Sequence, residues 1–279
     1  MFSVLTWIVW AAFSYVTHAD VDSYWMPLAE TFIAQGSGGF LLHNVPLWFV
    51  TCLFVVEIIY YFMADLKGLW VMAISIGLAT ISYWAINNLE SFDVTLLPWN
   101  IEVAMLAIPF YAAGHRAIEA KSHQGIMNLV NSHKTISIVL TAMFACVVYV
   151  GSQYNGSISF GHADLGKNVL VTYGCGLAGT LMWLIGCILL ADTKINKDGV
   201  KLLEWTKWFG RNSFNAMAIH NPIKGFVCVV VGIVLHCGSS AVSANSYYSF
   251  IAFLLTLVVT VIGMMFINWF KIKMSRKEK

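Results

Sequence analysis

Eight stretches of mostly apolar residues constrain the fold of this 279-residue chain more than any other feature. A helix rises about 1.5 Å per residue, so about 20 residues cross the roughly 30 Å of hydrocarbon in a bilayer. The apolar runs are continuous instead of alternating, which favours helices over a transmembrane β-barrel, and a helix satisfies its own backbone in lipid. We therefore predict an all-α, polytopic transmembrane helical bundle with about eight spans, near residues 2–18, 45–64, 68–86, 100–114, 135–152, 168–191, 212–235 and 248–270.

Composition supports a membrane environment. Hydrophobic residues make up 59% of the chain and charged residues 11%, whereas a soluble domain has about 25% charged residues. Water is therefore not the main solvent of this protein. We expect membrane lipid as its surroundings and no nucleic-acid partner.

The positions of the basic residues predict the topology, because cytoplasmic loops accumulate Lys and Arg. Most of them fall in alternate loops, and the last nine residues, 271–279, form a basic tail on the same side. Both termini are predicted to be cytoplasmic, in agreement with an even number of spans. The loop residues are Lys67, Arg116, Lys121, Lys134, Lys194, Lys197, Lys201, Lys207 and Arg211.

The chain is expected to form a single domain over residues 1–279, since it has no internal repeat, low-complexity run or long linker. Segment 192–211 combines five basic residues with Leu and Trp, which is typical of a short helix on the membrane surface. Five of the six Cys lie inside proposed spans and no two are closely spaced. The sequence therefore predicts neither a disulfide framework nor a metal site.

Ionisable residues within a span are costly in lipid and mark functional sites by default. Glu57 lies about 18 Å into the second span, near the bilayer centre. Glu102 lies at the outer end of the fourth span, where it could reach water or a polar substrate. A role in the site and a structural role remain open for both carboxylates.

His220 and Lys224 lie four residues apart in the seventh span, so they share one face of a helix. Pro222 removes a backbone donor and disfavours helical geometry at Asn221, which predicts a helix interruption here. Broken helices at membrane depth line cavities, so His220, Asn221 and Lys224 are expected to face one. A buried His that joins two helices is the alternative.

Three segments in order carry a family resemblance. Segment 44–54, NVPLWFVTCLF, resembles a Pro-Leu-Trp-Phe-Leu stretch that opens a span, and 96–114 resembles a Leu-Pro-Trp stretch followed by an aromatic-rich span closing on Gly. Segment 208–220, WFGRNSFNAMAIH, resembles a Gly-x-Asn-Ser stretch that runs into a late His. The chain thereby resembles the acyltransferase 3 family of integral membrane O-acyltransferases, in particular its fucose 4-O-acetylase-like members.

The resemblance implies transfer of an acyl group, usually acetyl, from cytoplasmic acyl-CoA to a sugar hydroxyl of a cell-envelope glycan or lipid-linked saccharide. It implies a multi-pass protein of the cell membrane, most simply a bacterial inner membrane, with no bound cofactor. A base must deprotonate the hydroxyl, and an imidazole suits that role. The catalytic candidates are His220, Glu57 and Glu102, where a carboxylate would fix the His220 tautomer. The substrate-binding candidates are Trp48, Trp99, Asn100, Asn221, Lys224, Arg211, Asn212 and Ser213.

One family feature is missing. The resemblance implies a His in the first span, preceded at a fixed spacing by a basic residue, and no Lys or Arg here has a His at that spacing. Met1 corresponds to the start of the family's third span, so the chain is expected to lack the first two helices. Two other interpretations stay open: a small-solute transporter or flippase, which a broken helix at the midplane would favour, and an inactive, truncated acyltransferase relative. The acceptor, the acyl chain and the oligomeric state are left open.

Overall fold

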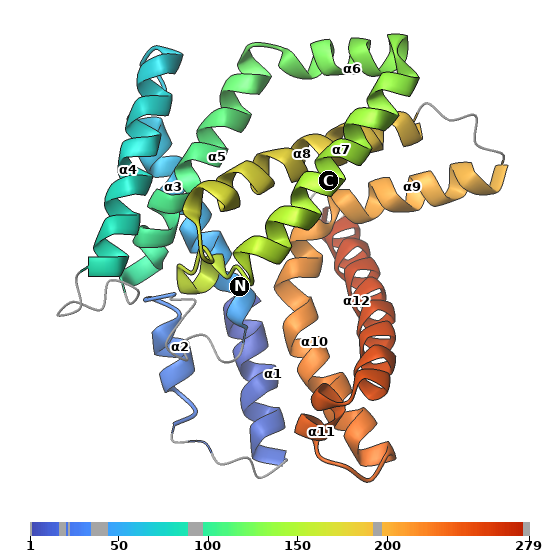
Figure 1. Ribbon diagram of the computed structural model, residues 1–279. Coiled ribbons are helices and arrows are strands. Elements are labelled where there is room, and N and C mark those ends of the chain that lie inside the picture. Colours follow the sequence, from blue (N-terminus) through green and yellow to red (C-terminus); the bar gives the residue numbers. More distant parts are fainter. Residues whose placement is uncertain are drawn as a thin grey trace. The chain divides into compact units, whose positions relative to one another are not determined.

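The computed structural model describes residues 2–16, 21, 23–34, 44–88, 97–191 and 197–275. Within these residues every element is a helix, and one isolated β-bridge joins Ser159 to Asp164. The predicted all-α class is therefore confirmed. The helices are α1 (Phe2–Val16), α2 (Met26–Glu30), η1 (Val45–Leu47), α3 (Trp48–Tyr61), α4 (Gly68–Asn88), η3 (Pro98–Asn100), α5 (Ile101–Glu119), α6 (Ser122–Ser132), α7 (Lys134–Asn155), η4 (Phe160–His162), α8 (Val169–Ala191), α9 (Lys197–Arg211), α10 (Ser213–Val234), α11 (Ser239–Ala244) and α12 (Ser246–Ser275) (Figure 1).

All eight predicted spans coincide with helices. Among the described residues, five helices are long and apolar enough to cross a membrane: Gly68–Asn88, Lys134–Asn155, Val169–Ala191, Ser213–Val234 and Ser246–Lys271. The other three predicted spans are the helices α1, α3 and α5, of 15, 14 and 19 residues. The cytoplasmic location of both termini stays a prediction.

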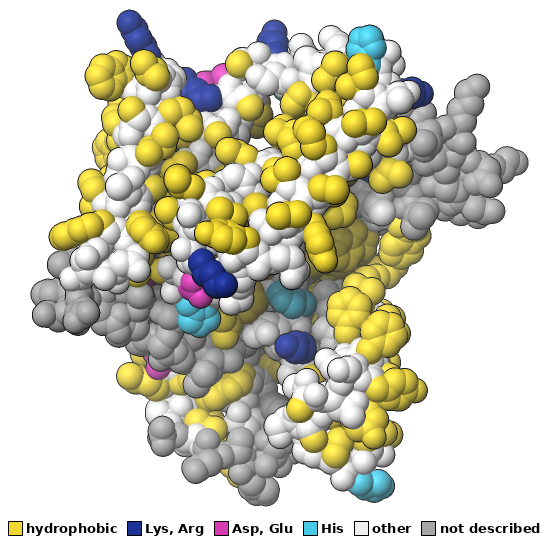
Figure 2. Space-filling model, in the orientation of Figure 1, with side chains coloured by type: hydrophobic (Ala, Val, Ile, Leu, Met, Phe, Trp, Pro, Cys, Tyr) yellow, Lys and Arg dark blue, Asp and Glu magenta, His cyan; other side chains and the backbone are white. Residues whose placement is uncertain are grey.

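Apolar side chains remain on the surface of these helices. Figure 2 shows hydrophobic side chains spread over the visible face, with few charged groups among them. Large exposed residues such as Trp183 on α8 and Phe253 on α12 are 68% and 60% exposed. Side chains of this kind are favourable against hydrocarbon and unfavourable against water, so these helix faces suit contact with lipid.

The chain divides into two units. The first comprises residues 1–48 and 204–279 and the second residues 49–203. In the first unit α10 packs along α12, and α1, η1 and α11 also contact α10. Near α11, the hydrophobic core of this unit includes Val227, Val231, Val242 and Ala252.

The second unit is built from two helix pairs, α4 with α5 and α7 with α8, and α6 contacts both α7 and α8. Small residues allow a close approach of α7 and α8, since a Cβ at Gly151 would overlap Cys175 Sγ. A Cβ at Gly176 would lie 2.8 Å from the Phe110 ring of α5. The prediction of one domain over residues 1–279 is not tested by this division.

Candidate functional site

His220 and Lys224 line one cavity in the first unit. The cavity has a volume of about 490 Å³ and lies along α10 and α12. Both residues come from α10 and are one helical turn apart, as their spacing predicted. Asn221 is not among the residues that line the cavity and is half-buried.

The predicted interruption at Pro222 is wrong, because α10 continues without a break from Ser213 to Val234. Pro222 has no N–H to donate to the carbonyl of Ala218, four residues earlier. Asn44 supplies the missing donor: its Nδ2 lies 2.6 Å from Ala218 O, and both residues are fully buried. The helix therefore continues through the proline, since a distant side chain satisfies the carbonyl that proline leaves free.

The imidazole of His220 has a defined tautomer. Its Nδ1 lies 3.1 Å from Ala216 O and 3.0 Å from Met217 O. Both partners are carbonyl oxygens, which can only accept, so Nδ1 carries the hydrogen. In the neutral ring the lone pair is then on Nε2. No partner of Nε2 is found among the residues that the structure describes, which leaves this atom able to accept a proton.

Asn212 joins three helices at the start of α10. Its Nδ2 donates to Trp208 O at 2.8 Å, and its Oδ1 accepts from Asn268 Nδ2 at 2.7 Å and from Asn215 Nδ2 at 3.4 Å. Its side-chain atoms are therefore engaged within the protein, between α9, α10 and α12. The neighbouring Ser213 and Arg211 are exposed, and Arg211 ends the amphipathic helix α9.

Two of the three family-like segments meet in this unit. The first contributes Asn44 and Trp48, and the third contributes Asn212 and α10 up to His220. The contact between Asn44 and Ala218 joins them two residues before His220. These segments lie far apart in the sequence. The fold brings them into contact close to His220, the candidate base.

The remaining candidates belong to the second unit. Glu57 is exposed on α3, whereas Glu102, in the first turn of α5, is 2% exposed. Trp99 packs edge-on against Phe54, with ring centroids 6.2 Å apart. Trp99 and the buried Asn100 have φ of 61° and 52°, in the left-handed region that non-glycine residues rarely adopt. A role of Glu57 or Glu102 in fixing the His220 tautomer stays a prediction.

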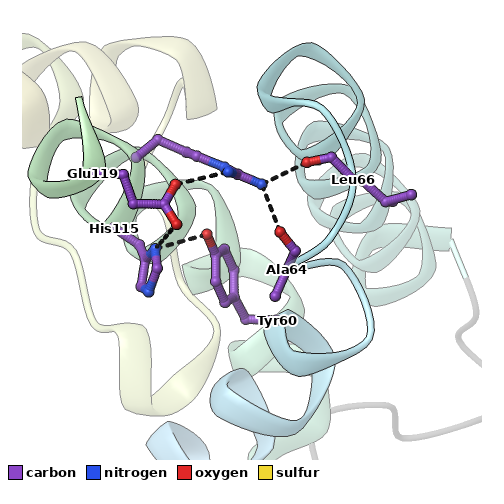
Figure 3. A network of polar contacts seen from close by, with 6 residues as sticks. Tyr60, Ala64, Leu66, His115 and Glu119 are labelled. Atoms are coloured by element: carbon purple, nitrogen blue, oxygen red, sulfur yellow. Dashed lines mark hydrogen bonds and ion pairs between the residues drawn. The ribbon is translucent and has the colours of Figure 1, made fainter.

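A second polar cluster was not predicted. Tyr60 Oη on α3 lies 3.0 Å from His115 Nδ1 on α5, and Glu119 Oε1 lies 3.5 Å from the same nitrogen (Figure 3). The rings of Tyr60 and His115 pack with centroids 4.6 Å apart. The signal in the sequence was the spacing of His115 and Glu119, which places them on one helix face.

Arg116 completes this cluster and closes the end of α3. Its Nη1 donates to Glu119 Oε2 at 2.7 Å, and its Nη2 donates to Ala64 O at 3.0 Å and Leu66 O at 2.7 Å. These carbonyls follow α3, where a helix leaves backbone acceptors without internal partners. The cluster therefore fixes the α3 terminus to α5. Among the described residues no group of three His, Cys, Asp or Glu could hold a metal ion.

The comparisons with known proteins agree with the motifs. A family model described as an acyltransferase domain matches residues 1–269, nearly the whole chain. The chain has no significant match to a curated protein or to a solved structure. Its apolar helices and this match make it a multi-pass membrane protein. The chain belongs to the acyltransferase 3 family.

Proposed function

We propose that the protein is a membrane O-acyltransferase that moves an acyl group, most simply acetyl, from acyl-CoA to a saccharide hydroxyl, with His220 as general base. The observation that carries the role of His220 is its tautomer. Nδ1 is held by two backbone carbonyls, so the neutral ring offers its lone pair at Nε2 on a residue that lines a cavity. A positioned imidazole of this kind contributes about 10²–10⁴-fold to a proton-transfer step.

The proposed step moves one proton and one acyl group. The acceptor hydroxyl gives its proton to His220 Nε2 while its oxygen attacks the thioester carbonyl carbon. A C–O bond forms, the C–S bond breaks, and the sulfur of coenzyme A leaves with the electron pair. The proton on Nε2 then passes to that sulfur, which yields the ester and free coenzyme A and returns His220 to its neutral form.

The predicted topology supports access of acyl-CoA from the cytoplasm. By the charge rule, α10 starts at the cytoplasmic side, directly after the basic helix α9. His220 lies seven residues beyond Ser213, which is about 10 Å along the helix. The carbonyl of a bound thioester would need to enter only this far, and we expect Arg211 on α9 to attract the phosphates of coenzyme A. An acyl donor that comes from the cytoplasm is consistent with a location in a bacterial inner membrane.

The test is acyl transfer from labelled acetyl-CoA by the full chain in lipid nanodiscs, with cell-envelope glycans as acceptors. His220→Ala should lower the rate by 10²-fold or more. His123→Ala is the matched control, since His123 is exposed on α6 in the second unit. Full transfer activity in His220→Ala would exclude His220 as the base. No transfer by the wild-type chain would identify it as an inactive relative.

A further inference from the structure

Besides His220, the polar side chains that line this cavity are Lys224 on α10, Ser243 on α11, and Ser249, Thr256 and Thr260 on α12. Lys224 carries an ammonium group, and Thr260 is the buried hydroxyl of this set. The cavity is bordered by Phe209 on α9 and by Ser243 on α11, so it follows α10 and α12 over most of their common length. Lys224 and Thr260 are therefore the cavity groups whose partners within the protein need to be identified.

Lys224 has no carboxylate partner among the described residues. In its unit these residues include two carboxylates, those of Glu30 and Glu204, and Glu204 forms its ion pair with Lys207. A cation within a membrane span is costly unless an anion or water accompanies it. No described side chain supplies an anion to Lys224. An anionic ligand in the cavity would provide this counter-ion.

Thr260 offers a hydroxyl without a partner. The side chain is 4% exposed, and its Oγ1 has no hydrogen-bond partner among the described residues. Thr256, one turn earlier on α12, also lines the cavity but donates to Ala252 O at 2.7 Å. A buried hydroxyl without a partner is unfavourable. The difference between the two threonines therefore points to a ligand at Thr260.

The helix register places Thr260 at the same level as His220. Asn212 and Asn268 contact each other at one end of the antiparallel pair α10 and α12. Counting equal numbers of residues from that contact along both helices brings His220 level with Thr260. Lys224 lies one turn, about 6 Å, further along α10 from Asn212. The three groups thus form a short row along the cavity.

We propose that this cavity takes an anionic saccharide acceptor, with its carboxylate or phosphate at Lys224 and its reacting hydroxyl between His220 Nε2 and Thr260 Oγ1. The inference rests on the proposed function for the identity of the reacting hydroxyl. The position of Lys224 in this row indicates that it binds the saccharide acceptor and not the acyl-CoA donor. In the proposed function acyl-CoA enters from the α9 end, and Lys224 lies beyond His220 as seen from that end.

The test measures binding without acyl-CoA, so that it does not depend on transfer. Methyl β-D-glucuronide and methyl β-D-glucoside differ in one carboxylate and form a matched probe pair for NMR titration of the full chain in nanodiscs. Polyprenyl-phosphate-linked glucose and octyl β-D-glucoside form the corresponding pair for phosphate. Lys224→Gln should weaken binding of the anionic probe about tenfold or more and leave the neutral probe unchanged, whereas Lys224→Arg should retain it.

The two threonines provide the second comparison. Thr260→Val should weaken binding of the saccharide probes about three- to tenfold without lowering the melting temperature, because it removes an unsatisfied hydroxyl. Thr256→Val should leave probe binding unchanged. Equal binding of the charged and neutral probes would overturn the proposal, as would weaker binding of acyl-CoA alone in Lys224→Gln. Charge-selective binding without acyl transfer would instead refute the proposed function and keep this site.

Discussion

The contact of Asn44 with Ala218 predicts a specific rescue. Asn44→Ala removes a side-chain donor to the buried carbonyl of Ala218, which Pro222 leaves without its helical partner. Pro222→Ala restores a backbone N–H at the position from which a helix donates to Ala218 O. The second substitution should therefore compensate for the first.

The magnitude follows from the chemistry of the lost contact. A buried carbonyl without a partner costs about 1–3 kcal/mol, and both Asn44 and Ala218 are fully buried. We expect Asn44→Ala to lower the free energy of unfolding by about 2 kcal/mol, or roughly 4–8 °C in melting temperature. The double variant Asn44→Ala/Pro222→Ala should recover about 1–2 kcal/mol of this loss. The cavity left by the truncated side chain is common to both backgrounds and cancels.

The assay is a double-mutant cycle of thermal unfolding in one detergent or lipid, with the wild type, both single variants and the double variant. Asn44→Asp adds an isosteric check, because a carboxylate places an acceptor against an acceptor and should destabilise the protein at least as much as alanine. Additive effects, with a coupling below about 0.5 kcal/mol, would refute the reasoning that Asn44 replaces the missing donor of Pro222.

Three further outcomes can be measured. Asn155→Ala should destabilise the second unit by about 2–4 kcal/mol in thermal unfolding, because the buried amide of Asn155 makes three hydrogen bonds where α7 meets α8. The control is Asn87→Ala. The amide of Asn87 is exposed and bonds within α4, so this substitution should change stability by less than about 0.5 kcal/mol. Arg116→Lys should destabilise by about 1 kcal/mol, since a single ammonium cannot reproduce the guanidinium contacts at the end of α3; an unchanged melting temperature would contradict this. The pKa of Glu204 is lowered by its hydrogen bond to Lys207 and by the charge of that residue. The pair therefore stabilises α9 at pH values above the ordinary carboxyl pKa, and this stabilisation is lost as the pH falls through the lowered pKa. NMR titration should show the Glu204 pKa rising in Lys207→Gln.

The sequence could predict the helices because their determinants are local. A continuous apolar run decides that a segment suits lipid, and in lipid the backbone must bond within the segment. The amphipathic helix at 197–211 and the common face of His220 and Lys224 follow from a repeat of about 3.6 residues, which is also local. The three motifs likewise lie in short segments, and the family match over residues 1–269 agrees with them.

The site depended on contacts that no local pattern contains. Asn44 and Ala218 are 174 residues apart, so their hydrogen bond, which carries α10 through Pro222, was not visible from either segment. From the segment alone, proline chemistry gave the wrong result of a broken helix. The cluster of Tyr60 and His115 likewise joins residues 55 positions apart.

The sequence by itself determined an all-helical membrane protein of the acyltransferase 3 family and the residues available to it, since hydrophobicity and backbone bonding act along a segment. The tertiary structure decided which of those residues work together. It satisfied the carbonyl of Ala218, which Pro222 leaves without its helical donor, and placed Thr260 level with His220. The physical reason is that a hydrogen bond requires two groups within about 3 Å, and only the packing of distant helices sets that distance.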